Sequence, residues 1–229
     1  CIRDSAKRDK WFIGFASWPE KITTEYEDQL TPQGMMQNIE ARLKSYRTDM
    51  LDMWRPVGAT WGEGQTNIAT LLMVSHKALD MVVEVFEKAR EQGKVRYLAV
   101  SAHNPKVFHR VLEEYPQFSA IIFPYLFLTE EFGGGSLLEL AQQTDVGQIE
   151  GRVDGKAHVL IKEMLQDPRI SAVIPGVNIP EQLEENVRGS YERDVPATEE
   201  DKQALLEFTR SFYANLPPEY QWLRAWRYV

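Results

Sequence analysis

Residues 93–105 decide the fold and read GKVRYLAVSAHNP. A helical pattern ends at Gly93, an apolar strand follows over residues 95–100, and the stretch closes on polar residues where a new helix opens. In an α/β barrel the loops after the strands converge on one face, and that face holds the active site. We therefore expect Ser101, His103 and Asn104 at the mouth of a site.

The same alternation of strand and helix continues on both sides of this stretch. Apolar runs predict strands at residues 11–16, 50–54, 95–100, 120–123 and 170–174. Amphipathic patterns predict helices at residues 32–43, 78–92, 105–115, 136–143, 157–166, 180–187 and 199–213. Apolar strands that alternate with helices are typical of a parallel sheet buried on both faces, so the fold class is α/β.

The predicted strands are too few to close a barrel. Five candidates are found, whereas a closed (β/α)8 TIM barrel needs eight strands. Residues 148–155 contain no apolar run, so two helices would follow one another without a strand between them. We therefore expect one barrel domain over residues 1–229 whose N-terminal strands and seventh strand are not represented in this sequence, with an aromatic tail at residues 216–229. A true deletion is disfavoured, because an open barrel would expose sheet edges to water.

Composition and charge exclude several classes of protein. Acidic residues outnumber basic ones by 34 to 26, and a net charge of -8 argues against binding to nucleic acid. No apolar run approaches the roughly 20 residues of a membrane helix. The single cysteine, Cys1, argues against an iron–sulfur cluster, and no histidines and carboxylates show metal-ligand spacing. A cytoplasmic location is the default expectation, and secretion stays open because the true N-terminus is not seen.

Four blocks of the chain resemble the aldo-keto reductase family. They read RTDMLDMW at residues 47–54, GKVRYLAVSAHNP at 93–105, QFSAIIFPY at 117–125 and IPGVNIPEQLEEN at 174–186. The resemblance implies a (β/α)8 barrel that transfers a hydride between a nicotinamide cofactor and a small carbonyl or alcohol. It covers nearly the whole chain in the order of the family.

The resemblance also implies a degenerate catalytic group. The family uses an aspartate, a tyrosine that protonates the carbonyl oxygen, a lysine and a histidine. The aspartate and tyrosine positions would precede residue 1, whereas Ala16 stands at the lysine position and Val57 at the histidine position. Neither side chain can donate a hydrogen bond or carry charge. His103 and Tyr125 are the remaining candidates for a proton donor. The alternatives are a histidine that caps the next helix or bonds a loop carbonyl, and a tyrosine in the core or pocket wall.

The family has three polar residues near the nicotinamide end of the cofactor, and this sequence keeps one of them. Ser101 stands where the family has a serine near the nicotinamide amide. Ala102 replaces an asparagine and Ile122 replaces a glutamine.

At the adenine end, the family pattern is better preserved. Glu185 and Asn186 match the pair that binds adenine, and the backbone at Gly176, Val177 and Asn178 could approach a phosphate. Gly176 and Gln182 stand where members that prefer NADP often have lysine and arginine, so weak discrimination between NAD and NADP is expected.

Two functional hypotheses follow. The first is an NAD(P)H-dependent oxidoreductase acting on a small carbonyl or alcohol, without a metal. The second is an inactive barrel that serves as a binding or assembly module, which Ala16, Val57, Ala102 and Ile122 favour. The sequence does not decide between a monomer and a homo-oligomer.

Overall fold

A computed structural model describes residues 8, 10–16, 31–56, 76–101, 105–124, 134–144, 147–151 and 157–216. Its six strands form one sheet in the order of the sequence, and every pair is parallel. The strands are β1 (Gly14–Ala16), β2 (Leu51–Arg55), β3 (Val95–Ser101), β4 (Phe118–Pro124), β5 (Gly147–Gly151) and β6 (Ala172–Ile174).

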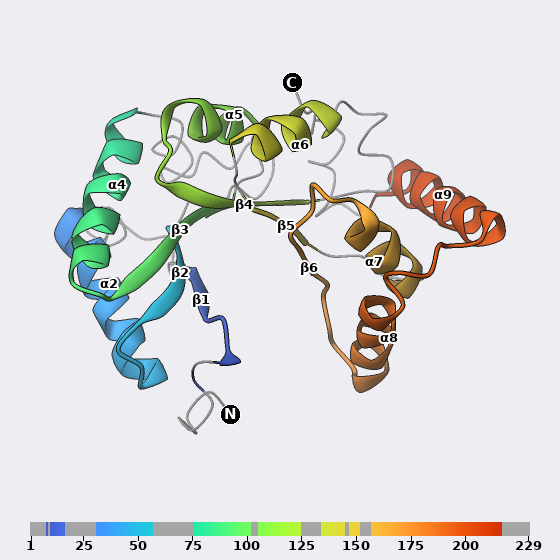
Figure 1. Ribbon diagram of the computed structural model, residues 1–229, viewed down its shortest axis with the longest axis horizontal. Helices are drawn as coiled ribbons and strands as arrows, with labels where there is room; N and C mark the ends of the chain where they lie inside the picture. The colour runs from blue at the N-terminus through green and yellow to red at the C-terminus, as the bar shows by residue number, and fades with distance from the viewer. Residues whose placement is uncertain are drawn as a thin grey trace.

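The helices lie outside the sheet, which curves so that they surround it on three sides (Figure 1). They are α2 (Pro32–Tyr46), α4 (His76–Glu91), α5 (Pro105–Glu114), α6 (Gly134–Gln143), α7 (Ala157–Gln166), α8 (Pro180–Tyr191) and α9 (Glu199–Ala214). Because every strand is parallel to its neighbours, all carboxyl ends meet at one edge of the sheet. The predicted α/β class is confirmed.

Capping residues explain where two of these helices begin and end. Thr31 caps α2 by accepting a hydrogen bond from the Gly34 amide to its side-chain oxygen at 3.0 Å, and Pro32 occupies the first turn. Arg47 ends α2 in the left-handed conformation with φ 54°. Gly93 follows α4 with φ 69°, which suits a residue without a Cβ. The predicted stop at Gly93 is confirmed.

The expected absence of a strand after Gly147 is wrong. Residues 147–151, GQIEG, form β5, which pairs in parallel with β4 on one side and with β6 on the other. A strand between two others is held by backbone hydrogen bonds that require no run of large apolar side chains. The alternation of strand and helix is therefore unbroken from β1 to β6. Within the described strands β1 and β6 are the edges of the sheet, which is not closed into a ring.

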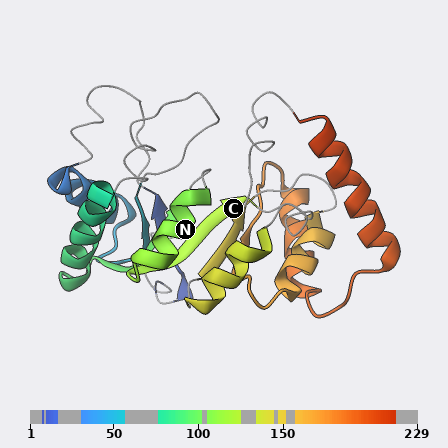
Figure 2. The same ribbon diagram turned by 90° about the horizontal axis from the view of Figure 1, so that it is seen from above.

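The main core lies between the sheet and its outer helices. Its largest fully buried side chains include Trp54 on β2, Phe86 on α4 and Phe108 on α5. A second and smaller cluster joins α7 to α9, with Val173 of β6 packed against it. Its six buried residues are Val159, Leu160, Met164, Ile170, Ala197 and Leu205. In Figures 1 and 2, α9 lies at one end of the molecule, and α2 and α4 lie at the other.

The opposite face of the sheet, which we call the inner face, is turned away from the helices. Met53, Ala99 and Ala120 form a separate small cluster there, with Ile122 packed against them. Strand alternation explains the division, because Trp54 and Val100, next in sequence to Met53 and Ala99, belong to the main core.

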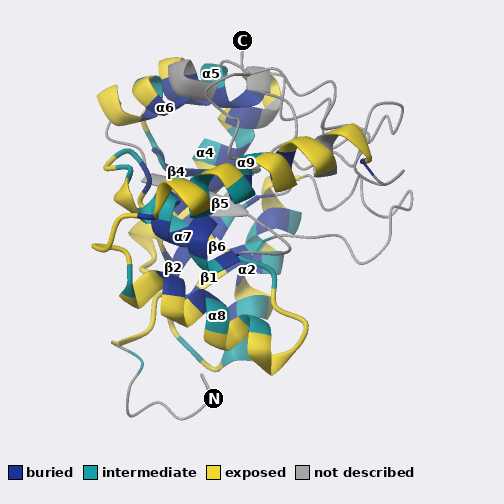
Figure 3. Ribbon diagram, turned by 90° about the vertical axis from the view of Figure 1, so that its right-hand side faces the viewer, coloured by how far each residue is buried: buried dark blue, intermediate teal, exposed yellow. Residues whose placement is uncertain are grey.

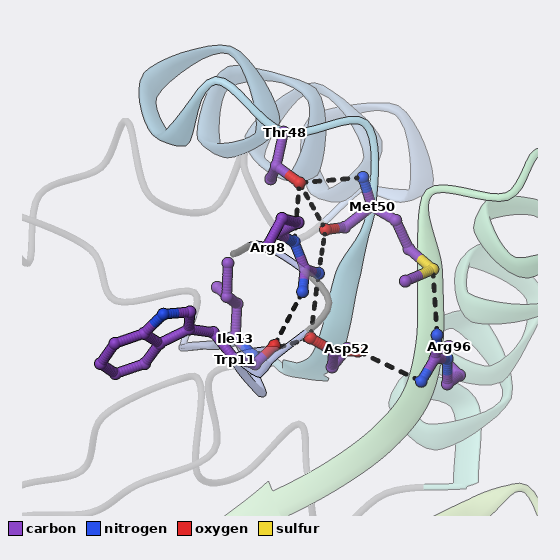
Figure 4. Close-up of polar contacts among 7 residues, drawn as sticks. All are labelled: Arg8, Trp11, Ile13, Thr48, Met50, Asp52 and Arg96. Atoms are coloured by element: carbon purple, nitrogen blue, oxygen red, sulfur yellow. Dashed lines mark hydrogen bonds and ion pairs between the residues drawn. The ribbon is translucent and has the colours of Figure 1, made fainter. Parts of the chain in front are cut away.

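A buried carboxylate, Asp52, ties the first three strands together (Figure 4). Its Oδ2 accepts hydrogen bonds from the backbone amide of Ile13 at 2.8 Å and from Arg8 at 2.9 Å. Its Oδ1 lies 3.4 Å from Arg96 Nη1 on β3. Asp52 is only 3% exposed, so two guanidinium groups and one amide compensate a charge that water does not reach.

Candidate cofactor and substrate site

The carboxyl edge of the sheet carries the polar residues that the sequence singles out. Ser101 is the last residue of β3, and the strand register pairs it with Ile122 of β4. The backbone register continues from Ile122 to Ile149 of β5 and from Ile149 to Ala172 of β6. The loop at residues 175–179 follows β6 and leads into α8. Ser101 and the loop before α8 therefore lie at the same edge of one sheet.

Ala16 ends β1, at the edge strand of the sheet. Its methyl group supplies no proton and no charge to the inner face. Val57, Ala102, His103 and Tyr125 lie outside the described residues. The role of His103 and Tyr125 as proton donors therefore stays a prediction.

The side chain of Gln182 caps the N-terminus of its own helix, α8. Its Oε1 accepts hydrogen bonds from the backbone amides of Asn178 at 2.7 Å and Ile179 at 3.3 Å. Ile179, at the N-terminal cap, makes no side-chain capping bond of its own, so the glutamine satisfies amides that the start of α8 would otherwise leave open. In this arrangement, its side chain is turned to the backbone and is not extended toward a ligand.

Glu185 and Asn186 lie on α8, one turn after its start. Glu185 is one-third exposed in its side chain, and its Oε1 lies 2.8 Å from Nδ1 of His158 on α7. Asn186 is only 7% exposed, and its Nδ2 has no hydrogen-bond partner among the described residues. A buried amide without a partner is costly unless a ligand or water satisfies it.

These two side chains fit the adenine end of a dinucleotide. An amide can donate to a ring nitrogen of a purine, and a carboxylate oxygen can accept from its exocyclic amino group. The unpartnered Nδ2 of Asn186 is the observation on this chain that favours such a ligand. His158 fixes one oxygen of Glu185, which leaves the other available.

His158 was not singled out from the sequence as a site residue. Its side chain is 24% exposed and meets Glu185 because α7 packs closely on α8. The approach is close because Gly189 of α8 has no side chain, and a Cβ there would lie 2.7 Å from the backbone oxygen of His158. The pair is separated by 27 positions, so no local pattern could have indicated it.

Arg55 is the second residue that the sequence reasoning missed. It ends β2, and the register makes it the Cα partner of Ala16 on β1. Burial lowers the pKa of its guanidinium below the ordinary value. The one signal in the sequence is a charged residue that closes an otherwise apolar strand.

In the described part of the chain, no group of three or more histidine, cysteine, aspartate or glutamate side chains is placed to hold a metal ion. Among the described helices, none combines the length and the apolar character needed to cross a membrane.

Several solved structures of aldo-keto reductases share this architecture. The holo form of an aldo-keto reductase from Bacillus halodurans superposes with a TM-score of 0.62 at 15% identity, covering 89% of this chain and 74% of that one. Its apo form gives 0.61 at 14% identity, with 90% and 74% covered. A thermostable aldo-keto reductase in complex with the inhibitor epalrestat gives 0.57 at 18%, with 89% and 74% covered. The TM-scores show a shared fold, and at identities below 20% the similarity shows the fold alone.

Sequence comparison places the chain in a family. No curated protein matches it. The model of the aldo/keto reductase family matches residues 1–153, which is more than half of the 229 residues. This match, which agrees with the parallel sheet and its outer helices, shows that the chain belongs to the aldo/keto reductase family.

Proposed function

We propose that this chain binds NAD(P)H and transfers a hydride between the cofactor and a small carbonyl or alcohol. The observation that carries the proposal is the buried, unpartnered side-chain amide of Asn186 beside Glu185. Membership of the family supports it, because aldo-keto reductases generally use this cofactor and act on small carbonyl compounds.

Different residues are assigned to different parts of the cofactor. Asn186 and Glu185 bind the adenine, and the backbone at Gly176, Val177 and Asn178 approaches the phosphates before α8 begins. Ser101 binds the nicotinamide amide from the end of β3. Gly176 has no side chain and Gln182 caps α8, so no cation from these positions meets a 2′-phosphate, and we expect similar affinities for NADH and NADPH.

The chain must also supply a proton. When bound, the reduced cofactor supplies a hydride to the carbonyl carbon, and the carbonyl oxygen takes up a proton from the protein. Ala16 cannot provide this proton. We assign it to His103 or Tyr125, which follow the carboxyl ends of β3 and β4 in sequence.

Fluorescence titration tests cofactor binding. The six tryptophans provide the signal, with NADH and NADPH as the probes. We expect saturable quenching by both, with affinities that differ by less than about tenfold. No change with either cofactor at about millimolar concentration would remove the cofactor from the proposal.

The substitution Asn186→Leu separates a ligand contact from a structural role. Leucine has a similar size and no polar atom, so it removes an unsatisfied buried amide and should leave the unfolding free energy unchanged or raised. Cofactor affinity should nevertheless fall by at least about tenfold. Ser190→Ala, on the exposed side of α8, is the matched control and should change neither quantity.

Turnover distinguishes the enzyme from an inactive binding module. Oxidation of NADPH with a panel of aldehydes and quinones should be detectable and should be lost in either His103→Ala or Tyr125→Phe. Binding of cofactor without turnover on the whole panel would favour the binding module, which Ala16 at the end of β1 makes the second candidate.

A further inference from the structure

Arg55 is a charged residue among uncharged neighbours on the inner face, near the carboxyl ends of the strands. The register and strand alternation place it among side chains without charge: Gly14, Ala16, Met53, Ala99, Ser101 and Ile122. The other charged residue of β2, Asp52, faces the opposite way. Arg55 is therefore the one charge that the described residues of β1 to β4 place on this part of the inner face.

The two charges of β2 are compensated differently. Asp52 has Arg8, Arg96 and the amide of Ile13 around it. Arg55 is half-buried, and no other described residue forms a hydrogen bond or ion pair with it. Burial disfavours its charged form, which agrees with the lowered pKa. A guanidinium in such a place is stabilised when an anion approaches it.

The position of Arg55 relates it to the reaction. It is the last residue of β2 and neighbours Ala16, where the family carries a lysine. On β3, Ser101 ends the next strand at the same edge. The inner face thus carries a cation, Arg55, one strand away from Ala16, where the family has its lysine. This position is beside the place where a substrate would meet the nicotinamide.

We propose that Arg55 binds a carboxylate of the substrate, so that this chain acts on carbonyl compounds that carry a carboxylate group. The proposal rests on the proposed function and specifies its substrate class. A guanidinium can bind both oxygens of a carboxylate through two parallel hydrogen bonds, which fixes the position of the adjoining carbonyl. A neutral substrate of the same shape would leave the guanidinium without a partner in a site shielded from water.

A matched pair of probes tests the proposal. 4-Carboxybenzaldehyde carries the carboxylate, and methyl 4-formylbenzoate is its neutral ester of similar shape. Calorimetric titration in the presence of NADP⁺ measures binding without reduction. We expect the wild-type protein to bind the acid at least about tenfold more tightly than the ester.

Substitutions assign the preference to Arg55. Arg55→Gln should weaken binding of the acid by at least about tenfold and leave the ester unchanged, so that the preference disappears. Arg55→Lys keeps the charge without the planar fork and should retain part of it. Arg90→Gln, an exposed arginine of α4, is the control and should bind both probes as the wild type does.

The outcomes separate this inference from the proposed function. Failure of the wild type to bind NADH and NADPH would contradict the proposed function. Normal cofactor binding with equal affinity for acid and ester would overturn the carboxylate site alone. Loss of both probes in a folded Arg55→Gln variant would show a structural role and would also overturn it. If that variant does not fold, the comparison of acid and ester on the wild type decides the question.

Discussion

Asp52 is a residue whose effect on stability follows directly from its contacts. The side chain accepts the backbone amide of Ile13, which is itself buried, and compensates Arg8 and Arg96. Asp52→Ala would leave the amide without a partner and two guanidinium groups without their carboxylate. We expect the free energy of unfolding, measured in urea, to fall by about 2 to 3 kcal/mol.

A neighbouring aspartate supplies the control for this experiment. Asp49 is exposed and precedes β2, so Asp49→Ala should change the unfolding free energy by less than about 0.5 kcal/mol. Equal effects of the two substitutions would contradict the role assigned to Asp52.

Tyr115 gives a residue-scale prediction about pH. Its hydroxyl donates to Asp80 at 2.9 Å and lies 3.2 Å from Nδ1 of His76. Burial and the bond to Asp80 raise the pKa of the phenol from 10.0 to about 12; Glu114 acts in the same direction and Arg110 opposes it. The neutral phenol is therefore favoured in the folded protein. Its contribution to stability is complete below pH about 10 and is lost as the pH rises toward about 12.

Difference measurements isolate this phenol among nine tyrosines. The absorbance titration of the wild type minus that of Tyr115→Phe should show one ionisation near pH 12. The stability advantage of the wild type over the variant should shrink as the pH rises above about 10. An ionisation near pH 10, or an advantage that grows in this range, would contradict the proposed environment.

At the scale of elements, the contact between α7 and α8 depends on Gly189. A Cβ at this position would lie 2.7 Å from the oxygen and 2.9 Å from the Cα of His158, both of which are backbone atoms. Gly189→Ala must therefore push the helices apart, although alanine favours a helix. We expect a loss of about 1 to 3 kcal/mol in unfolding free energy.

The same displacement should affect the cofactor site. Moving α7 away from α8 lengthens the contact between His158 and Glu185, which is 2.8 Å in the structure. NADH affinity, measured by tryptophan fluorescence, should fall together with stability in Gly189→Ala and should be unchanged in Ser190→Ala. A Gly189→Ala protein as stable as the wild type would show that the two helices are less tightly packed than described.

Comparison of individual elements shows what the sequence could predict. The helices were predictable because apolar positions repeat with helical spacing, and α7 was predicted with its observed bounds. β5 was missed because GQIEG has no apolar run, and its two neighbouring strands hold it through the backbone. Its presence depends on elements distant in the chain.

The candidate site divides in the same way. The resemblance to the aldo-keto reductase family indicates Glu185 and Asn186, but the partner of Glu185 and the unpartnered amide of Asn186 follow from the packing of α7 on α8. The sequence shows Arg55 as a charged residue at the end of an apolar strand. Its position beside Ala16 follows only from the strand register. Sequence patterns indicate chemistry within one element and do not reveal contacts between elements.

For the molecule as a whole, the division of the core has consequences for local stability. The main cluster joins β1 to β4 with α2, α4, α5 and α6. The cluster between α7 and α9 contains only six buried apolar residues in the described part of the chain, with Val173 of β6 packed against it. α8 buries only Asn186 and Gly189. Most of its ribbon has the colours of exposed and intermediate residues in Figure 3. Elements with little buried apolar surface open at lower free energy than the core strands.

Hydrogen exchange followed by mass spectrometry should therefore resolve two levels of protection. We expect amides of α8 and α9 to exchange through openings at least about 2 kcal/mol less costly than those of β2, β3 and β4. Saturating NADH should slow exchange in α7 and α8, because a ligand that binds only the closed form raises the cost of opening them. The protection of β2 to β4 should change less, since their core does not include α8. Uniform exchange across the molecule would show that the two clusters unfold as one unit. A NADH effect confined to β2 to β4 would place the cofactor away from Glu185 and Asn186.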